Sequence, residues 1–135
     1  MIKTNIGCNG LVIKDNKLLL GLRKNCKGEG TYGLPGGHLE QGERLVDGVK
    51  RELYEECGVR ALRLRFSSIV DERLPSEMYI QVNFVVSEYE GTITCVEKDK
   101  CAGWEWFDIN SLPHNIFPPH IPIITVYKQN IAYLQ

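Results

Sequence analysis

The sequence predicts an α+β domain in which helices pack against a mixed or antiparallel sheet. Two observations support this fold class. Segments rich in apolar and β-branched residues lie on both sides of one strongly helical segment, so strands, a helix, more strands and a final helix follow one another. The 135 residues are also enough for a single domain, residues 1–135, that buries roughly two thirds of its unfolded surface.

The first half of the chain predicts a β-hairpin, a loop and a helix. Residues 6–13 and 18–23 are apolar and predict two strands, and the tripeptide "DNK" at 15–17 supplies the turn between them. Glycine and proline oppose regular structure in "KNCKGEGTYG" and "LPGGHLEQGE", so we expect both stretches to be irregular. The helix should then begin near Glu43 or Arg44. Its core stripe consists of apolar residues at helical spacing: Leu45, Val46, Val49 and Leu53.

The second half predicts further strands and a final helix. The expected strands are residues 60–74, 78–91, 92–97 and 104–109. Alternation along the last of these indicates that Trp106 packs in the core. Asn110 or Ser111 should cap a brief helical turn. The final helix should begin near Ile121 or Pro122, since proline is tolerated in a first helical turn.

Composition and charge exclude several classes of function. The formal net charge of −1 and the isoelectric point near 6.3 give no electrostatic reason to expect non-specific nucleic-acid binding. The five cysteines are odd in number and form no C-x-x-C pair, which argues against a disulfide framework and a zinc site. No apolar run approaches the roughly 20 residues that span a bilayer. We therefore expect a cytoplasmic protein with reduced thiols and no membrane partner, and a homodimer stays open.

The stretch "RELYEECG" carries an unusual charge cluster. In a helix, Glu52, Glu55 and Glu56 lie on one face within about one turn, where like charges repel. Gly58 is the expected residue after the helix end, so the cluster also lies near the negative end of the macrodipole. A solvated charged face is the ordinary explanation for such a triad. A divalent cation is the alternative, because it replaces repulsion with attraction, and oxygen ligands favour Mg²⁺ or Mn²⁺.

The residues around the cluster favour the metal site. The glycine pair Gly36-Gly37 follows "LP", and its backbone can approach a ligand closely. Fixed spacings connect Gly37 with the residues that follow it: Glu43, Arg51, Glu52, Leu53, Glu55, Glu56, Gly58 and Val59. This pattern matches the Nudix box in every defined position. The chain therefore resembles a Nudix hydrolase, a family that hydrolyses nucleoside diphosphates linked to another moiety.

The resemblance implies a fold and a set of roles. The expected fold is an α/β/α sandwich with a mixed sheet and the box as a catalytic loop-helix-loop. Arg51 and Glu43 resemble the ion pair that orients the catalytic helix. Glu52 matches the general base of some family members, although others place the base elsewhere. The resemblance also assigns the oxygen ligands of Mg²⁺, with Mn²⁺ as the alternative ion: Glu52, Glu55, Glu56 and the carbonyl of Gly36.

Residues outside the helix are candidates for substrate binding, and Gly37 belongs with them because its backbone is close to the metal site. Arg23 could reach a phosphate, as similar arginines do in MutT-type members, or it could be an exposed cation at a strand end. His38 resembles the histidine of the MutT-homologue-2 nucleotide diphosphatase subgroup that faces the substrate, and a solvent-exposed loop histidine is the alternative. Phe117 could stack on a nucleobase or pack in the core. His114 and His120 lie outside any motif and are expected to be structural.

A fourth acidic ligand is expected from a late loop. Glu97 could complete the metal site, as a late glutamate does in MutT-type enzymes. Glu90, Asp99 and Glu105 lie nearby in the sequence and compete for the same role.

The resemblance predicts an acid anhydride hydrolase. We expect a Mg²⁺-dependent pyrophosphohydrolase that cleaves a small nucleotide, a (deoxy)nucleoside triphosphate or related diphosphate derivative, to the monophosphate and pyrophosphate. The alternative enzymatic substrates are a nucleotide sugar, a dinucleoside polyphosphate or a capped RNA end. A non-catalytic Nudix-fold nucleotide sensor is the alternative of a different class, and the intact box argues against it.

Overall fold

The protein is a mixed sheet with a helix on each face. A computed structural model describes residues 3–73 and 75–135. Its strands are β1 (Lys3–Lys14), β2 (Lys17–Arg23), β3 (Tyr32–Gly33), β4 (Gly36–His38), β5 (Arg60–Arg73), β6 (Glu77–Glu90), β7 (Cys101–Asp108) and β8 (Tyr133–Leu134). Its helices are α1 (Leu45–Cys57), the short 3₁₀ helix η1 (Pro118–His120) and α2 (Ile121–Gln129).

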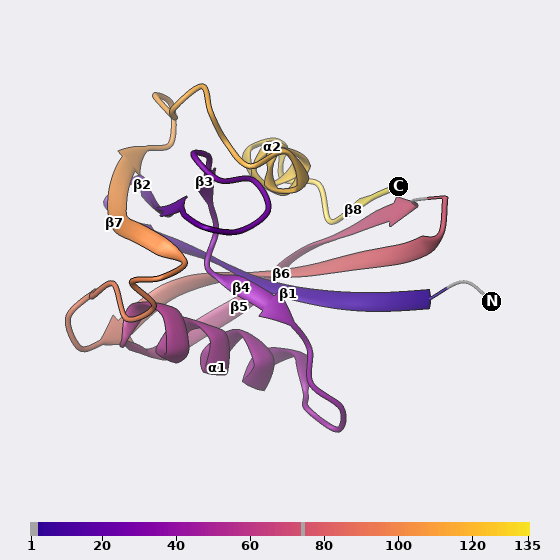
Figure 1. Cartoon of the computed structure of the whole chain (residues 1–135), viewed down its shortest axis with the longest axis horizontal. Coiled ribbons are helices and arrows are strands. Elements are labelled where there is room, and N and C mark those ends of the chain that lie inside the picture. The colour runs from indigo at the N-terminus through magenta and orange to yellow at the C-terminus, as the bar shows by residue number, and fades with distance from the viewer. Residues whose placement is uncertain (1–2, 74) are drawn as a thin grey trace.

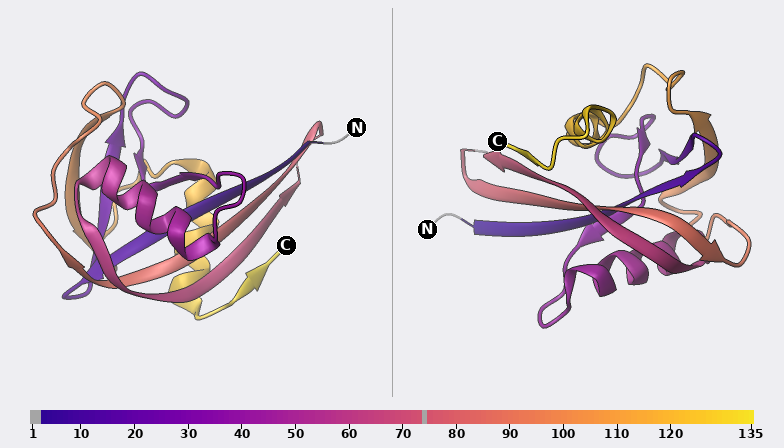
Figure 2. Two further views of the ribbon diagram at one scale, coloured as in Figure 1. Left: turned by 90° about the horizontal axis from the view of Figure 1, so that it is seen from below. Right: turned by 180° about the vertical axis from the view of Figure 1, so that it is seen from behind.

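Strand β1 joins the two parts of the sheet. It runs parallel to β6 along most of its length and antiparallel to β2 and β4. Across the sheet the strand order is β3-β2-β1-β6-β5-β8, with β4 paired to β1 and β7 paired to β2. Helix α1 lies on one face of this sheet and α2 on the other (Figures 1 and 2). The expected α/β/α sandwich with a mixed sheet is therefore confirmed.

Alternation along the strands builds a separate core on each face. In β6, Val82 and Val86 pack toward α1, whereas Val85 packs toward α2. In β1, Val12 belongs to the first cluster and Leu11 to the second. This period of two is what a strand buried on both faces requires. The sheet thus fixes α1 and α2 independently.

The predicted hairpin and both predicted long helices are confirmed. β1 and β2 pair antiparallel around Asp15 and Asn16, whose positive φ angles of 52° and 62° are typical of a two-residue hairpin turn. Helix α1 begins at Leu45, directly after the predicted start, and ends at Cys57, followed by Gly58 with a left-handed φ of 72°. Helix α2 begins at Ile121.

Some predicted segments need correction. Residues 36–38 of the "irregular" glycine-rich stretch form β4, because their backbone pairs with β1. Residues 92–97 are not a strand, because their amides bond to the end of α1: Thr94 N–H donates to the Cys57 carbonyl over 2.9 Å. No helical turn follows Asn110, whose N–H instead donates to Asp108 Oδ1 over 2.8 Å, and the short helix is η1.

The boundaries of the remaining strands agree closely with the predictions. The long segments 60–74 and 78–91 form the antiparallel pair β5 and β6, and Leu74 of the first segment lies outside the described residues. β7 begins at Cys101, three residues before the predicted start. Across residues 3–73 and 75–135, no helix has both the length and the apolar character needed to cross a membrane.

Candidate active site

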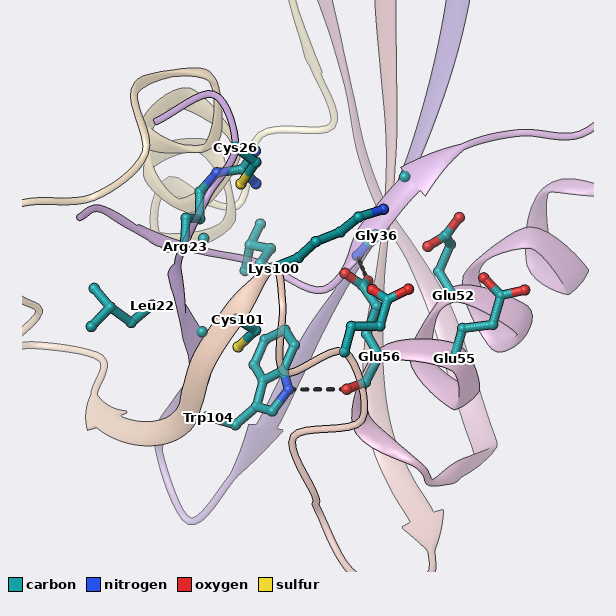
Figure 3. Close-up of a pocket in the computed structure, with 15 residues that line it drawn as sticks. Leu22, Arg23, Cys26, Gly36, Glu52, Glu55, Glu56, Lys100, Cys101 and Trp104 are labelled. Atoms are coloured by element: carbon teal, nitrogen blue, oxygen red, sulfur yellow. Dashed lines mark hydrogen bonds between the residues drawn. The ribbon is translucent and has the colours of Figure 1, made fainter. Parts of the chain in front are cut away.

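A pocket of about 410 Å³ opens between α1, β4, the end of β2 and the start of β7. Four carboxylates line it together: Glu52, Glu55 and Glu56 from α1 and Glu97 from the loop before β7. Cations, thiols and an indole line the same pocket: Arg23, Lys100, Cys26, Cys101 and Trp104 (Figure 3). The three helix carboxylates of the sequence pattern therefore share one cavity with the candidate loop carboxylate.

Arg51 ties the helix to the loop that precedes it. Its guanidinium donates to both carboxylate oxygens of Glu43, with Nε 2.7 Å from Oε2 and Nη2 3.0 Å from Oε1. Nη2 also donates to the His38 carbonyl over 3.1 Å, and Nη1 donates to Glu52 Oε1 over 2.8 Å. These bonds hold the pKa of Glu43 below its usual value and raise the pKa of Arg51. One cation thus orients both sides of the loop-helix junction.

The glycine pair fits closely around two of the glutamates. Gly36 N–H donates to Glu56 Oε1 over 2.7 Å. A Cβ on Gly37 would lie 2.6 Å from Glu52 Oε1, so a larger residue there would displace that carboxylate from its present position. A Cβ on Gly36 would collide with the Cys8 carbonyl of β1. Both glycines are therefore required by close approach between β1, β4 and α1.

Burial disfavours the ionised forms of Glu52 and Glu56, and hydrogen bonds within the protein offset this only in part. Burial raises the pKa of Glu56 to about 8, against the opposing hydrogen bond from Gly36, and the charges of Glu52 and Glu97 raise it further. Burial also raises the pKa of Glu52, and its hydrogen bond from Arg51 opposes this rise. The site therefore favours an added cation.

The loop of residues 92–100 covers the end of α1. The Glu56 carbonyl accepts hydrogen bonds from Trp104 Nε1 over 3.1 Å and from Val96 N–H over 3.3 Å. These bonds satisfy a helix-end carbonyl and hold Glu97 beside the pocket. The competing residues are exposed, and of the four acidic candidates only Glu97 lines the pocket: Glu90, Asp99 and Glu105 do not.

The donor set fits a hard divalent cation. Partly buried carboxylates that repel one another are the oxygen ligands Mg²⁺ and Mn²⁺ prefer. In the part of the chain that the structure describes, no three acidic, histidine or cysteine side chains converge as tightly as they do around a bound ion. The candidate ligands thus line one cavity, but their carboxylates are not yet as close together as they would be around an ion.

A second pocket of about 380 Å³ adjoins the first and shares Arg23 and Gly36 with it. The Arg23 guanidinium lies 3.9 Å from the centre of the Phe117 ring, and its Nε donates to the Lys27 carbonyl over 2.8 Å. His38 is exposed at the rim of this pocket. Arg23, His38 and Phe117, candidates far apart in the sequence, thus line one cavity.

Buried amides form the sheet side of the second pocket. Asn9 Nδ2 donates to Gln81 Oε1 over 2.7 Å and to Asn83 Oδ1 over 3.0 Å, and Asn83 Nδ2 donates to Ser68 Oγ over 3.2 Å. Asn9 and Gln81 line the pocket itself. Sequence reasoning missed both, although an Asn and a Gln inside otherwise apolar strands are a signal that could have found them.

His120, which we expect to be structural, is buried in the wall of the second pocket next to α2. Its side chain is 6% exposed, and Nδ1 accepts a hydrogen bond from Leu34 N–H over 2.9 Å. Burial lowers its pKa to about 3, and the charge of Arg23 lowers it further. The imidazole is therefore neutral at physiological pH.

The two tryptophans lie on the same face of β7, because they are two residues apart. Both Trp104 and Trp106 pack against the core cluster beneath α1. The prediction that alternation places Trp106 in the core holds, and the same alternation places Trp104 beside it. Sequence reasoning also missed Lys100, whose position depends on the fold of the loop before β7.

Comparison with known proteins identifies relatives along most of the chain. The family model described as "NUDIX domain" matches residues 4–127. The ADP-ribose pyrophosphatase of Methanocaldococcus jannaschii is 36% identical over 128 residues, which cover 92% of this chain and 73% of that protein. The oxidized purine nucleoside triphosphate hydrolase of Mus musculus is 32% identical over 105 residues, covering 76% of this chain and 65% of the mouse protein.

A solved structure agrees with the arrangement of elements. The MutT NUDIX hydrolase from Burkholderia pseudomallei superposes with a TM-score of 0.85 at 26% identity, covering 91% of this chain and 97% of the other.

Proposed function

The chain belongs to the NUDIX family and is a Nudix hydrolase, and from this premise we propose that it is a Mg²⁺-dependent pyrophosphohydrolase of nucleoside triphosphates. One observation carries the proposal. The glutamates of the Nudix box and Glu97 line one cavity, which adjoins a second cavity with polar and aromatic walls. The acidic cavity suits a metal-bound polyphosphate, and the cavity with polar and aromatic walls suits a nucleoside.

The acidic residues of the first cavity and Gly36 are the expected metal ligands in the proposal. Glu52, Glu55, Glu56, Glu97 and the Gly36 carbonyl would hold Mg²⁺, with Mn²⁺ as the alternative. When bound, the cation neutralises the diphosphate and favours activation of a water molecule. Arg51 keeps Glu52 in place through its bonds to Glu52 and Glu43.

The proposed reaction is an attack of water on phosphorus. Glu52, the position that matches the general base of some family members, would accept the proton of the attacking water, and its hydrogen bond from Arg51 orients the carboxylate. Water attacks the β-phosphorus. The bond between this phosphorus and the oxygen that bridges it to the α-phosphate breaks as the new bond forms. The nucleoside monophosphate leaves with its bridging oxygen, and pyrophosphate carries the oxygen of the attacking water.

The residues of the second cavity would hold the nucleoside. Phe117 offers a flat apolar face whose opposite side is covered by Arg23, and His38 lies at the rim. Gly37, the other glycine of the pair, lines the first cavity, and Gly36 lines both cavities. Asn9 and Gln81 offer amide groups at the floor.

A second candidate substrate is ADP-ribose. The relative from Methanocaldococcus jannaschii, named ADP-ribose pyrophosphatase, favours it. ADP-ribose carries the same diphosphate but has a second sugar in place of the terminal phosphate. The reaction at phosphorus would be of the same kind.

The test is hydrolysis in water enriched in ¹⁸O, followed by mass spectrometry of the products. Nucleoside triphosphates and ADP-ribose are supplied separately with Mg²⁺. We expect turnover of at least one nucleoside triphosphate, with the label in pyrophosphate and none in the monophosphate. Release of orthophosphate and a nucleoside diphosphate as first products would refute the proposed bond cleavage. Turnover of ADP-ribose alone would favour the second candidate.

A further inference from the structure

Two cations, Arg23 and Lys100, line the first pocket together with the carboxylates. We propose that Lys100 binds the terminal phosphate of the substrate, with Arg23 contacting the phosphates that lead to it, and that Lys100 so selects nucleotides that end in a free phosphate over those whose phosphates are both esterified. The inference rests on the proposed function, because it assigns an orientation to the polyphosphate in that cavity. It adds Lys100 as a substrate-binding residue.

The fold places the backbone of Lys100 next to the end of β2, where Arg23 lies. Arg23 is the last residue of β2 and pairs with Cys101, the first residue of β7. Lys100 therefore lies one residue before the paired part of β7. Lys24 N–H donates to the Lys100 carbonyl over 2.9 Å, and Lys100 N–H donates to the Glu97 carbonyl over 3.0 Å. The backbone on both sides of the pocket mouth is thus fixed.

The loop that carries Lys100 has further anchors outside the pocket. Lys24 Nζ donates to the Lys98 carbonyl over 3.0 Å, and Asn25 Nδ2 donates to the Asp99 carbonyl over 3.1 Å. These bonds join the loop to the segment that follows β2. The backbone of Lys100 therefore has a defined position relative to Arg23.

Neither cation uses its full binding capacity within the protein. The side chain of Lys100 extends across the pocket toward Gly36 and the glutamates of α1 (Figure 3). Among residues 3–73 and 75–135, its ammonium group forms no ion pair and no hydrogen bond. Arg23 is oriented through Nε and its contact with Phe117, so its Nη groups have no hydrogen-bond partner within the same residues.

The charge of the ligand decides what such a pair recognises. A terminal phosphate carries about −1.5 to −2 charges at neutral pH, whereas a phosphate esterified on both sides carries about −1. Arginine binds phosphate through its planar fork, and lysine adds a compact point charge. Arg23 also lines the second pocket, so it can contact the chain of phosphates between the nucleoside and Lys100.

The test compares Lys100→Met, Lys100→Arg and Lys98→Met. Lys98 is exposed on the same loop, does not line the pocket and contributes only its carbonyl to the anchors, so it is the matched control. Steady-state kinetics are measured with a nucleoside triphosphate that the wild type hydrolyses and with ADP-ribose. Isothermal titration with Mg²⁺ and inorganic pyrophosphate measures binding of a free terminal phosphate directly.

We expect Lys100→Met to raise KM for the triphosphate and weaken pyrophosphate binding by roughly 10- to 100-fold, the range for a lost hydrogen bond to a charged group. KM for ADP-ribose should change less than threefold if ADP-ribose is a substrate, and kcat should change little. Lys100→Arg should recover most of the loss, and Lys98→Met should match the wild type.

Several results would overturn the inference. An equal loss with both substrates would make Lys100 a general neutraliser of the glutamates, and so would a loss confined to kcat. Turnover of ADP-ribose with no turnover of triphosphates would contradict the selectivity itself. If no nucleotide is hydrolysed, the proposed function fails. The pyrophosphate titration still tests whether Lys100 binds a free terminal phosphate. Equal affinity in wild type and Lys100→Met, or no affinity in either, would then refute the role of Lys100.

Discussion

Replacing His120 with asparagine should remove a specific loss of stability at acidic pH. The imidazole is buried, accepts the Leu34 N–H through Nδ1 and lies edge-on to Phe117, with ring centres 4.9 Å apart. Protonation would turn that acceptor into a donor facing another donor. The residue also precedes the positive end of α2, which opposes a second positive charge. The folded protein therefore binds a proton at His120 much more weakly than the unfolded chain.

The sign and size of the effect follow from the pKa of His120. The pKa is lowered from 6.5 to about 3, so the stabilisation is complete above pH 6.5 and is lost as the pH falls toward 3. The maximum slope is about 1.4 kcal/mol per pH unit. At pH 5 this group alone costs about 2 kcal/mol of unfolding free energy relative to pH 8.

Urea denaturation in EDTA at pH 5 and pH 8 measures the effect. Asparagine retains an oxygen acceptor for Leu34 but does not titrate, so His120→Asn should lose about 2 kcal/mol less than wild type between the two pH values. Other titrating groups are common to both proteins and cancel in the comparison. His114→Asn is the matched control, because His114 is exposed, and it should follow the wild type. An identical pH dependence in His120→Asn and wild type would refute the reasoning.

Three further predictions concern the Nudix box. Glu56→Gln should abolish turnover and most of the Mg²⁺-dependent rise in melting temperature, while the melting temperature in EDTA holds or rises because glutamine replaces a buried carboxyl group whose ionised form is disfavoured. A large decrease in EDTA would indicate a structural role. Arg51→Lys removes the pair of hydrogen bonds from the guanidinium to the Glu43 carboxylate, so urea denaturation should show a free energy of unfolding lower by about 2 kcal/mol. No change would contradict the importance of that pair. Gly37→Ala brings a methyl carbon against the Glu52 carboxylate, so kcat should fall at least about tenfold with an unchanged circular dichroism spectrum. A wild-type kcat would show that Glu52 has room to move.

The parts of the fold that were predictable have local signals. The hairpin depends on the turn at Asp15 and Asn16, and α1 depends on its apolar stripe and the glycine that ends it. The roles of Glu43 and Arg51 followed from family spacing, and their direct hydrogen bonds agree with it. Such features are determined within a few residues of one another, so a sequence pattern can contain them.

The parts that were missed depend on partners distant in the sequence. β4 has no apolar alternation, and it is a strand only because β1 accepts and donates its backbone hydrogen bonds. Residues 92–97 have strand-like composition, but the unpaired carbonyls at the end of α1 bind them instead. Lys100 enters the pocket because its loop is tied to Lys24. None of these contacts produces a periodic pattern of apolar residues in the local sequence.

Strand β1 serves the two sides of the sheet with neighbouring residues. Cys8 packs beneath α1, with Sγ 3.5 Å from the Gly37 carbonyl, and Asn9 lines the second pocket on the opposite face. A substitution at Asn9 changes the groups offered to a ligand and leaves the support of α1 intact. A substitution at Cys8 does the reverse. Natural variation along this strand can therefore explore new ligands at one set of alternate positions, while the hydrolytic helix is inherited unchanged.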